Sequence, residues 1–365
     1  MDDKNNRNDI INDIPMRDIF EGVDYDVNTY MTEHEGKELF VIGEGFNHGH
    51  ALFGMDDFVR KVESSKGFGF KVSKNTKGKT QLEELALGKY FSSLNYWTGE
   101  LLQYPPDIFT MSPHVGVFAD ACRELHLMEE TFTRPAVIHR PGVTGADLYN
   151  TLITCIREKT KTAVFKKRCK ASENNYRRNL KSYTGYFNAL LNRWSRLLVL
   201  RVDLYFPTEP AGFISVEKAH VARENFLNNM RSNSLFTDLK GLIWKLEFGR
   251  DRGHHFHFIF MFGAQRKQDE WIGEEIGKYW MARIAPGGSY NNCNKYPNKY
   301  KRRGVGEINH DDAQKREMFL VEVLGYLIKQ DQCLMVKPSK GRSIGRMEMP
   351  KARTSAAGRP RKKAQ

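Results

Sequence analysis

The stretch that decides the fold is residues 239–262, LKGLIWKLEFGRDRGHHFHFIFMF. It holds two apolar runs, Leu239 to Phe248 and His254 to Phe262, separated by GRDRG at 249–253. Apolar runs of this length, rich in aromatic and branched side chains, are typical of buried β-strands. The short connection between two glycines predicts that the two strands form an antiparallel hairpin.

The histidines of the second strand carry the candidate chemistry. Alternate side chains of a strand share a face, so His255 and His257 point the same way, and two such imidazoles can bind one divalent ion at ~2.1 Å. If 249–253 forms a symmetric loop, Glu247 lies directly opposite His255, with Cβ atoms ~5 Å apart. We therefore predict a metal site of Glu247, His255 and His257, whose N and O ligands suit Mg²⁺ or Mn²⁺. The alternative is a pair of histidines that only packs in the core.

The elements around the hairpin predict the topology. The hairpin is preceded by a strand at 197–206 and a helix capped by Ser215, and followed by a helix at 269–283, a strand at 304–308 and a helix from Asp311 or Asp312 to Lys329. This order, strand–helix–strand–strand–helix–strand, is the split βαβ arrangement of ferredoxin-like folds. It predicts an α+β domain with a central antiparallel sheet, in which the third strand lies beside the first.

The last predicted helix carries Tyr326, with Lys329 one helical turn beyond it. A phenol has a pKa of about 10, so a nucleophilic tyrosine needs a metal or a cation nearby to stabilise its phenolate. Tyr326, Lys329 and a metal on the facing sheet are the groups that such a reaction requires. The alternative is that Tyr326 is a core aromatic residue and Lys329 caps the helix C-terminus.

Together, WKLEFGRDRGHHFH at 244–257 and GYLIK at 325–329 resemble the HUH endonucleases, specifically the rolling-circle replication initiators of small plasmids and filamentous (inovirus-type) phages. The resemblance covers residues 190–338. It implies that His255 and His257 bind the metal, that Tyr326 is the nucleophile, and that Lys329 assists. Glu247 is not fixed by the resemblance, because the family varies at the third ligand.

One tyrosine stands in this motif, so the resemblance implies single-tyrosine action. The enzyme would nick origin DNA, single-stranded or in a hairpin, form a 5′-phosphotyrosine intermediate and later rejoin the ends. The implied partners are the helicase and polymerase of a bacterial host, with the protein in its cytoplasm. Two rivals remain: a relaxase or single-strand transposase with the same chemistry, and a non-catalytic DNA-binding regulator.

The charge also points to nucleic acid. The chain has a formal net charge of +13 and a pI near 9.4. Residues 1–36 are acidic, so the excess of Lys and Arg falls on the remainder, where it would neutralise phosphates. The predicted DNA contacts are Lys166, Lys167, Arg168, Arg177, Arg178, Lys301, Arg302, Arg303, Arg359, Arg361, Lys362 and Lys363. The alternatives are a solvated basic helix at 157–181 and a basic tail with generic phosphate affinity; GRP at 358–360 is similar to an AT-hook core.

These observations predict four regions. They are an acidic flexible arm (1–36), a mixed α/β N-terminal extension of unassigned role that includes the basic segment 157–181 (37–184), the HUH endonuclease domain (185–340) and a basic DNA-binding tail (341–365). No apolar run approaches the ~18 residues of a membrane span, and the polar N-terminus does not resemble a secretory signal. Five scattered cysteines without CxxC spacing predict neither a zinc cluster nor disulfides. The absence of a P-loop sequence argues against an appended helicase.

Overall fold

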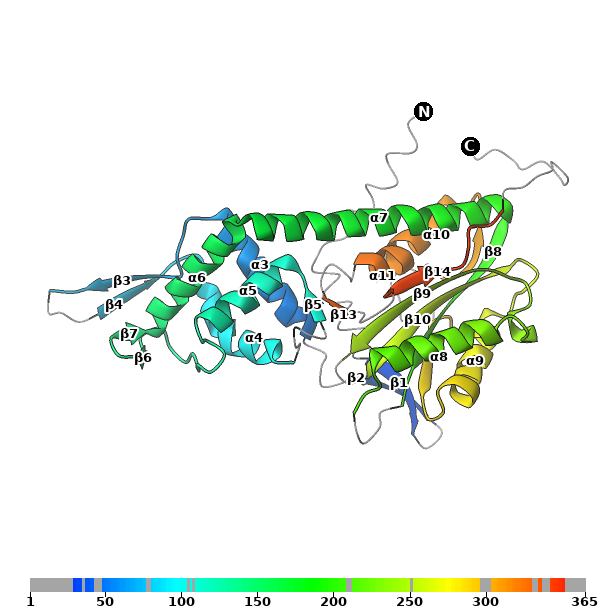
Figure 1. Ribbon diagram of the computed structural model, residues 1–365, viewed down its shortest axis with the longest axis horizontal. Helices are drawn as coiled ribbons and strands as arrows, with labels where there is room; N and C mark the ends of the chain where they lie inside the picture. Colours follow the sequence, from blue (N-terminus) through cyan, green and yellow to red (C-terminus); the bar gives the residue numbers. More distant parts are fainter. Residues whose placement is uncertain are drawn as a thin grey trace, which may run out of the picture.

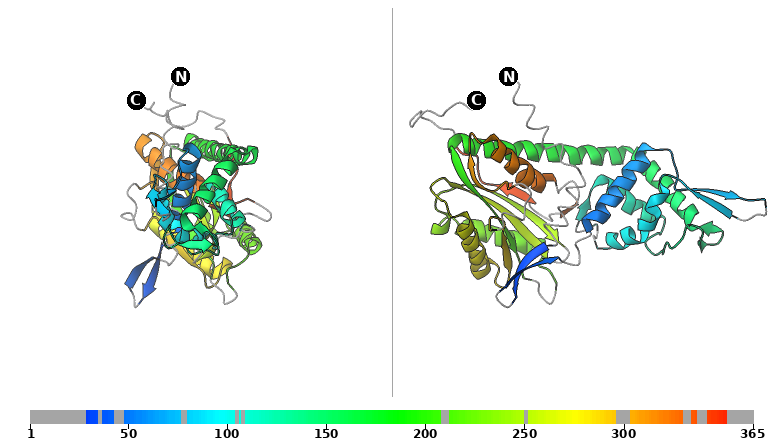
Figure 2. Two further views of the ribbon diagram at one scale, coloured as in Figure 1. Left: turned by 90° about the vertical axis from the view of Figure 1, so that its left-hand side faces the viewer. Right: turned by 180° about the vertical axis from the view of Figure 1, so that it is seen from behind.

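The computed structural model describes residues 29–34, 37–42, 48–76, 80–103, 106, 109–207, 212–249, 252–295, 303–329, 334–336 and 342–351. Figure 1 shows two lobes joined along one side by a single long helix, α7 (Ala163–Arg193). The view from behind gives the same elongated arrangement (Figure 2). At 1.5 Å per residue a helix of 31 residues is about 46 Å long, so α7 is long enough to run along both lobes.

The C-terminal lobe is built on a six-stranded sheet in which all neighbouring strands are antiparallel. Its strands are β8 (Arg196–Tyr205), β9 (Leu239–Gly249), β10 (Gly253–Gly263), β11 (Ser289–Asn292), β12 (Gly306–Asn309) and β14 (Ile344–Arg346). The order is β11-β8-β10-β9-β14, with β12 also paired to β8. The third strand, β10, therefore lies beside the first, β8, as predicted. The α+β class is confirmed.

Three strands depart from the prediction. No element was predicted between the helix at 269–283 and the strand at 304–308, but β11 lies there and pairs with one end of β8, while β12 pairs with the other end. β14 lies within the predicted tail (341–365), so the first part of that region belongs to the sheet. β13 (Leu334–Val336) pairs with β5 (Phe109–Met111) of the other lobe and not with the sheet.

The hairpin has the predicted register. Phe248 pairs with His254 and Glu247 with His255. Gly253 has φ of +63°, a left-handed conformation that glycine adopts without strain and that other residues rarely take. This glycine therefore allows β10 to begin opposite Gly249 and sets the register of the histidines.

Helices cover both faces of the sheet. One face packs against α8 (Val216–Asn229) and α9 (Asp269–Tyr279), and its core includes Phe256, Phe258 and Phe260. The other face packs against α7 and the segment that carries Tyr326. Ser215 caps α8, as predicted, by accepting a hydrogen bond from the Lys218 backbone N–H.

The helix predicted to run from Asp312 to Lys329 is not uniform. It consists of α10 (Ala313–Met318), a π-helical segment (Phe319–Gly325) and α11 (Tyr326–Lys329). Asp312 caps its start, as predicted. A π-helical turn contains more residues than an α-helical one, so the segment before Tyr326 changes the direction of that side chain relative to a regular helix.

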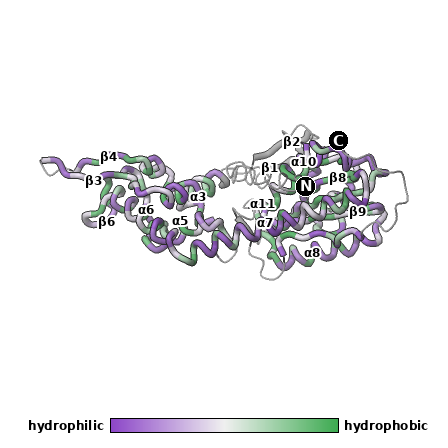
Figure 3. The backbone as a smooth tube through the Cα atoms, turned by 90° about the horizontal axis from the view of Figure 1, so that it is seen from above, coloured by the Kyte–Doolittle hydropathy of each residue, from purple (hydrophilic) through white to green (hydrophobic). Residues whose placement is uncertain are grey.

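The N-terminal lobe is mostly helical, with its own apolar core. Its elements are α3 (His48–Ser64), β3 (Phe70–Lys74), β4 (Thr80–Glu84), a 3-10 helix (Gly88–Ser93), α4 (Leu94–Leu101), β5, α5 (Pro113–Glu124), β6 (Ile138–Arg140), β7 (Val143–Thr144) and α6 (Gly145–Lys161). The β3–β4 hairpin extends from the far end of this lobe (Figures 1 and 3). Thr144 caps α6 through a capping box with Asp147.

Two predicted boundaries change. The division at 184/185 falls inside α7, which contributes Phe165 to the N-terminal core and Leu190 to the core of the sheet lobe. The predicted flexible arm, 1–36, contains β1 (Thr29–His34), which pairs with β2 (Lys37–Ile42). In the described part of the chain, no helix is both long enough and apolar enough to span a bilayer.

Candidate metal centre

The hairpin brings the three predicted ligands together. One ligand atom each from Glu247, His255 and His257 lies within 4.8 Å of the other two. Both histidines are fully buried, and Glu247 is 9% exposed. Phe256 and Phe258 point to the opposite face and fix the strand in the apolar core. The cluster therefore stands on a rigid strand pair, and these residues could hold a metal ion.

His255 is oriented as a metal ligand. Its Nδ1 lies 3.1 Å from the backbone carbonyl oxygen of Gly253. A carbonyl oxygen only accepts hydrogen bonds, so Nδ1 carries the proton and Nε2 of the neutral ring carries the lone pair. Nε2 is buried, has no hydrogen-bond partner among the described residues, and lies 4.0 Å from Glu247 Oε2. Burial, aided by the neighbouring His257, lowers the pKa of His255 to about 3. A neutral imidazole with an unused buried nitrogen is the form that binds a divalent ion.

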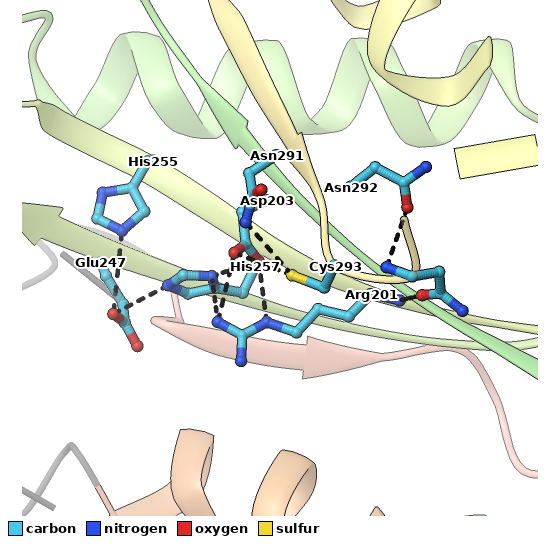
Figure 4. A network of polar contacts seen from close by, with 9 residues as sticks. Arg201, Asp203, Glu247, His255, His257, Asn291, Asn292 and Cys293 are labelled. Atoms are coloured by element: carbon cyan, nitrogen blue, oxygen red, sulfur yellow. Dashed lines mark hydrogen bonds and ion pairs between the residues drawn. The ribbon is translucent and has the colours of Figure 1, made fainter. Parts of the chain in front are cut away.

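His257 lies between two carboxylates (Figure 4). Its Nδ1 is 2.6 Å from Asp203 Oδ1, and its Nε2 is 3.1 Å from Glu247 Oε2. Burial lowers the pKa of His257, but the charges of Asp203 and Glu247 outweigh burial and raise it to about 10. For Glu247 the directions are reversed. Burial alone would raise the pKa of this carboxyl, but the charge and the hydrogen bond of His257 outweigh burial and lower the pKa to about 2. Without a metal, the positive charge of His257 thus compensates the buried carboxylates; a divalent ion bound at Nε2 would replace that proton and its charge.

Asp203 and Arg201 are components of the site that the sequence analysis missed. Asp203 lies directly opposite His257 on β8, and Arg201 Nε donates to Asp203 Oδ1 at 3.0 Å. Burial raises the pKa of Asp203, but Arg201 and His257 outweigh it and hold that pKa well below the usual range. A carboxylate on the distal nitrogen of a ligand histidine fixes the ring and increases its basicity. The sequence did contain a signal for these two residues, because they are charged and stand at positions i and i+2 of an otherwise apolar strand.

A third missed residue, Lys245, links the ligand strand to the helix of Tyr326. It is 2% exposed, pairs across the hairpin with His257, and its Nζ donates to the carbonyl of Leu327 at 3.3 Å. Leu327 and Ile328 are fully buried and Tyr326 is partly buried. The side chain of Lys329 lies outside the described residues.

A stack of side chains extends from the site towards the end of the hairpin. The ring of Tyr205 stacks on His255 with centroids 5.3 Å apart, and the Arg252 guanidinium lies 4.1 Å from the centroid of Tyr205. This cation–π contact holds a permanent positive charge at the end of the hairpin, one stacked ring away from His255.

The predicted DNA-contacting residues fall into three groups. Lys166, Lys167, Arg168, Arg177 and Arg178 are exposed on α7. Arg303 is partly buried; it donates to Asn294 O at 2.9 Å and lies 3.3 Å from Asp269 Oδ2, so it joins the segment after β11 to α9. The others lie outside the described residues: Lys301, Arg302, Arg359, Arg361, Lys362 and Lys363.

Comparison with known proteins places the chain in a family. Residues 158–341 match the model described as YagK/YfjJ C-terminal domain, and the chain belongs to this family. The match spans about half of the chain and includes α7, the three candidate ligands, Asp203 and Tyr326. No curated protein and no solved structure matches the chain.

Proposed function

We propose that this protein is a metal-dependent, single-tyrosine DNA endonuclease of the HUH class, which nicks and rejoins origin DNA in rolling-circle replication. The observation that carries the proposal is the Glu247–His255–His257 cluster on the sheet face that packs against the Tyr326 helix. The strand order, with β10 between β8 and β9, is the order that a ferredoxin-like HUH domain would have.

The energetics of the cluster support a functional role. Arg201, Asp203, Lys245, Glu247 and His257 place five ionisable groups in the interior. Desolvating each charge costs several kcal/mol, and the attraction between partners often does no more than offset that cost. An apolar set of similar volume would serve the fold at least as well, so the charges indicate a site selected for its chemistry.

In the proposed reaction, a divalent ion on Glu247, His255 and His257 would supply Lewis-acid polarisation of the scissile phosphate. The Tyr326 hydroxyl attacks phosphorus, the bond to the 3′ oxygen breaks, and the phenol's proton is balanced by protonation of the leaving 3′ oxygen. The products are a free 3′-OH and a 5′-phosphotyrosine. A later 3′-OH reverses the step and rejoins the strand without ATP, because the link retains the energy of a phosphodiester.

Further side chains support the roles in this scheme. The side chain of Glu247 is 11% exposed whereas those of His255 and His257 are fully buried, so we expect the phosphate to approach from the Glu247 side. Arg252 supplies a positive charge at the end of the hairpin, on the Tyr205 side of His255. Lys329, one turn beyond Tyr326, is proposed to stabilise the phenolate and the charge on the phosphoryl oxygens.

The outer face of α7 supports DNA as the partner. Lys166, Lys170, Arg177 and Lys181 are exposed and follow one another at spacings of 4, 7 and 4, which places them on one stripe of the helix. Such a stripe can neutralise successive phosphates of one strand. This feature would serve a relaxase, a single-strand transposase or a non-catalytic regulator equally well, and only the chemistry at Tyr326 separates the enzymes from the regulator.

The decisive experiment looks for a covalent protein–DNA species. The protein is incubated with Mg²⁺ or Mn²⁺ and single-stranded origin DNA, and adducts that survive SDS are counted. Tyr326→Phe should remove the adduct with little change in DNA binding, and Lys329→Ala should slow its formation. Tyr96→Phe, at an exposed tyrosine of the other lobe, is the matched control. A nucleotide mapped to a tyrosine other than Tyr326, or cleavage undiminished in Tyr326→Phe, would disprove the assignment.

A further inference from the structure

A cavity of about 460 Å³ lies outside the metal centre, between the two lobes. Its walls come from β5, α5, the N-terminal half of α7 and Ile328 of α11. Figure 1 shows these elements meeting where the lobes join. The volume falls within the roughly 300–1,000 Å³ typical of small-molecule sites, which occur preferentially at domain interfaces. Ile328 is two residues from Tyr326, so a ligand in this cavity would lie beside the helix of the proposed nucleophile.

The lining has two chemically different parts. Apolar and aromatic side chains form one part: Phe109, Met111, Tyr176 and Ile328. Three charged side chains form the other: Arg123 donates to Asp120 Oδ1 at 2.9 Å, and Arg168 lies 3.6 Å from Asp120 Oδ2. The side chains of Asp120, Arg123 and Arg168 are each 42–59% exposed, so they are accessible from solvent, with one positive charge in excess.

We propose that this cavity binds one nucleotide unit, with its base against the apolar wall and its phosphate at Arg123 and Arg168. Guanidinium groups bind phosphate oxygens in a bidentate manner, and flat apolar and aromatic surfaces accept a base by stacking. Asn175 and Asp120, also in the lining, offer hydrogen-bonding groups of the kind that read base edges. A purely apolar ligand would make no contact that uses the charged part of the lining.

The nucleotide unit could belong to the DNA strand or be free in solution. The DNA source rests on the proposed function, because the strand would continue from Tyr326 past Ile328 into the cavity. Binding itself does not depend on nicking. All measurements are therefore made on full-length Tyr326→Phe protein without added metal, in which no covalent adduct forms at Tyr326.

The structure offers two matched pairs of variants. A Cβ at Gly116 on α5, in the cavity wall, would meet no heavy atom within 4 Å, so we expect the side chain of Gly116→Leu to occupy part of the cavity. Gly185→Leu, at an equally open helical glycine of α7 outside the cavity, is its control. Arg168→Ala is matched by Arg196→Ala, since each arginine has a side chain at least 40% exposed that is paired with one acid, Asp120 and Glu307 respectively, and Arg196 lies outside the cavity.

The probes are the four 5′-deoxynucleoside monophosphates and a ten-nucleotide single-stranded oligonucleotide of mixed sequence, measured by calorimetry or saturation-transfer NMR. We expect at least one monophosphate to bind, with affinity reduced tenfold or more by Gly116→Leu and severalfold by Arg168→Ala. Gly185→Leu and Arg196→Ala should each stay within twofold of the parent for the monophosphate. If Gly116→Leu fails to fold, the arginine pair decides.

Binding of the oligonucleotide shows whether the nucleotide unit belongs to a DNA strand or is free in solution. A strand that enters the cavity should displace the monophosphate and bind Gly116→Leu at least tenfold more weakly than Gly185→Leu. A free nucleotide as ligand predicts no displacement and equal oligonucleotide affinity in these two variants. The proposal is overturned if monophosphates bind Gly116→Leu as tightly as the parent, or if none binds and the oligonucleotide does not distinguish the two variants. A protein that binds the probe but forms no adduct with Tyr326 intact would refute only the proposed function.

Discussion

The two faces of the C-terminal sheet differ along the same strands. On the α8–α9 face every inward residue of β10 from Phe256 to Phe262 is aromatic. The α7–α11 face is apolar only at one end, where Ile259 and Met261 lie. Its other end carries His255, His257 and the charged side chains of β8 and β9. The same strands form both faces, so strand geometry does not explain the difference in their side chains. We attribute the charged end of one face to the proposed metal chemistry.

The comparison separates stability from chemistry. The aromatic face gains free energy from each buried ring, at about 25 cal/mol per Å² of apolar surface. At the charged end, removing the charges from water costs free energy, and the contacts among Asp203, His257 and Glu247 offset that cost. Substitutions on the aromatic face should therefore reduce stability, and substitutions at the charged end should mainly reduce activity.

The largest effect is expected from removing both histidines. His255→Ala combined with His257→Ala should abolish divalent-dependent nicking of origin DNA, because two of three metal ligands are lost. DNA affinity, measured by anisotropy, should stay close to that of the parent. Undiminished nicking by the double variant would remove the metal site from the mechanism, and global unfolding would show that the histidines serve packing.

On the opposite face, Phe258→Ala should lower the free energy of unfolding by about 3–5 kcal/mol, the usual cost of removing a buried ring. Phe258 is fully buried and packs edge-on against Phe226 of α8 at 5.2 Å between centroids. Urea titration followed by circular dichroism measures the loss. Nicking below the unfolding transition should persist; a variant that is stable but inactive would contradict the separation of the two faces.

Bound metal should stabilise the parent protein but not the site variant. An ion present at 100 times its Kd adds about 2.7 kcal/mol to the unfolding free energy of a protein that binds it only when folded. Thermal denaturation with and without Mn²⁺ tests this, and His257→Ala should show no such increase. Equal stabilisation of both proteins would place the ion elsewhere.

A smaller effect is expected at Asp203. Asp203→Asn keeps the size of the side chain but removes the charge that orients His257, and losses of such partners cost about 10–100-fold in metal affinity or activity. The readout is the Mn²⁺ concentration that gives half-maximal nicking, which should rise while the rate at saturating Mn²⁺ changes less. An unchanged Mn²⁺ requirement would limit Asp203 to a structural role.

The smallest effect on catalysis is expected from deleting residues 351–365. The deletion removes six basic residues, so DNA binding should weaken and its dependence on salt should flatten. Nicking of a short single-stranded origin at saturating protein should be retained. If log Kd against log salt keeps its slope, the tail makes no DNA contact.

Local patterns in the sequence predicted much of this lobe. The two apolar runs and Gly253 gave the hairpin its register, because neighbouring strands joined by a short turn have few other ways to pair. Ser215 and Asp312 marked helix starts through hydrogen bonds from a backbone N–H three residues ahead. The alternation of β10 placed the histidines on one face.

What only the tertiary structure decided depends on distant pairing. Short strands such as β11, β13 and β14 carry weak local signals and are defined by partners far away in sequence, and β13 pairs with the other lobe. The position of Asp203 against His257 requires the pairing of β8 with β10, across 54 residues, which no local pattern specifies. The π-helical segment before Tyr326 interrupts what the sequence pattern predicted to be a single regular helix. The cluster of candidate ligands was therefore readable from the sequence, whereas the charged environment that surrounds it was not.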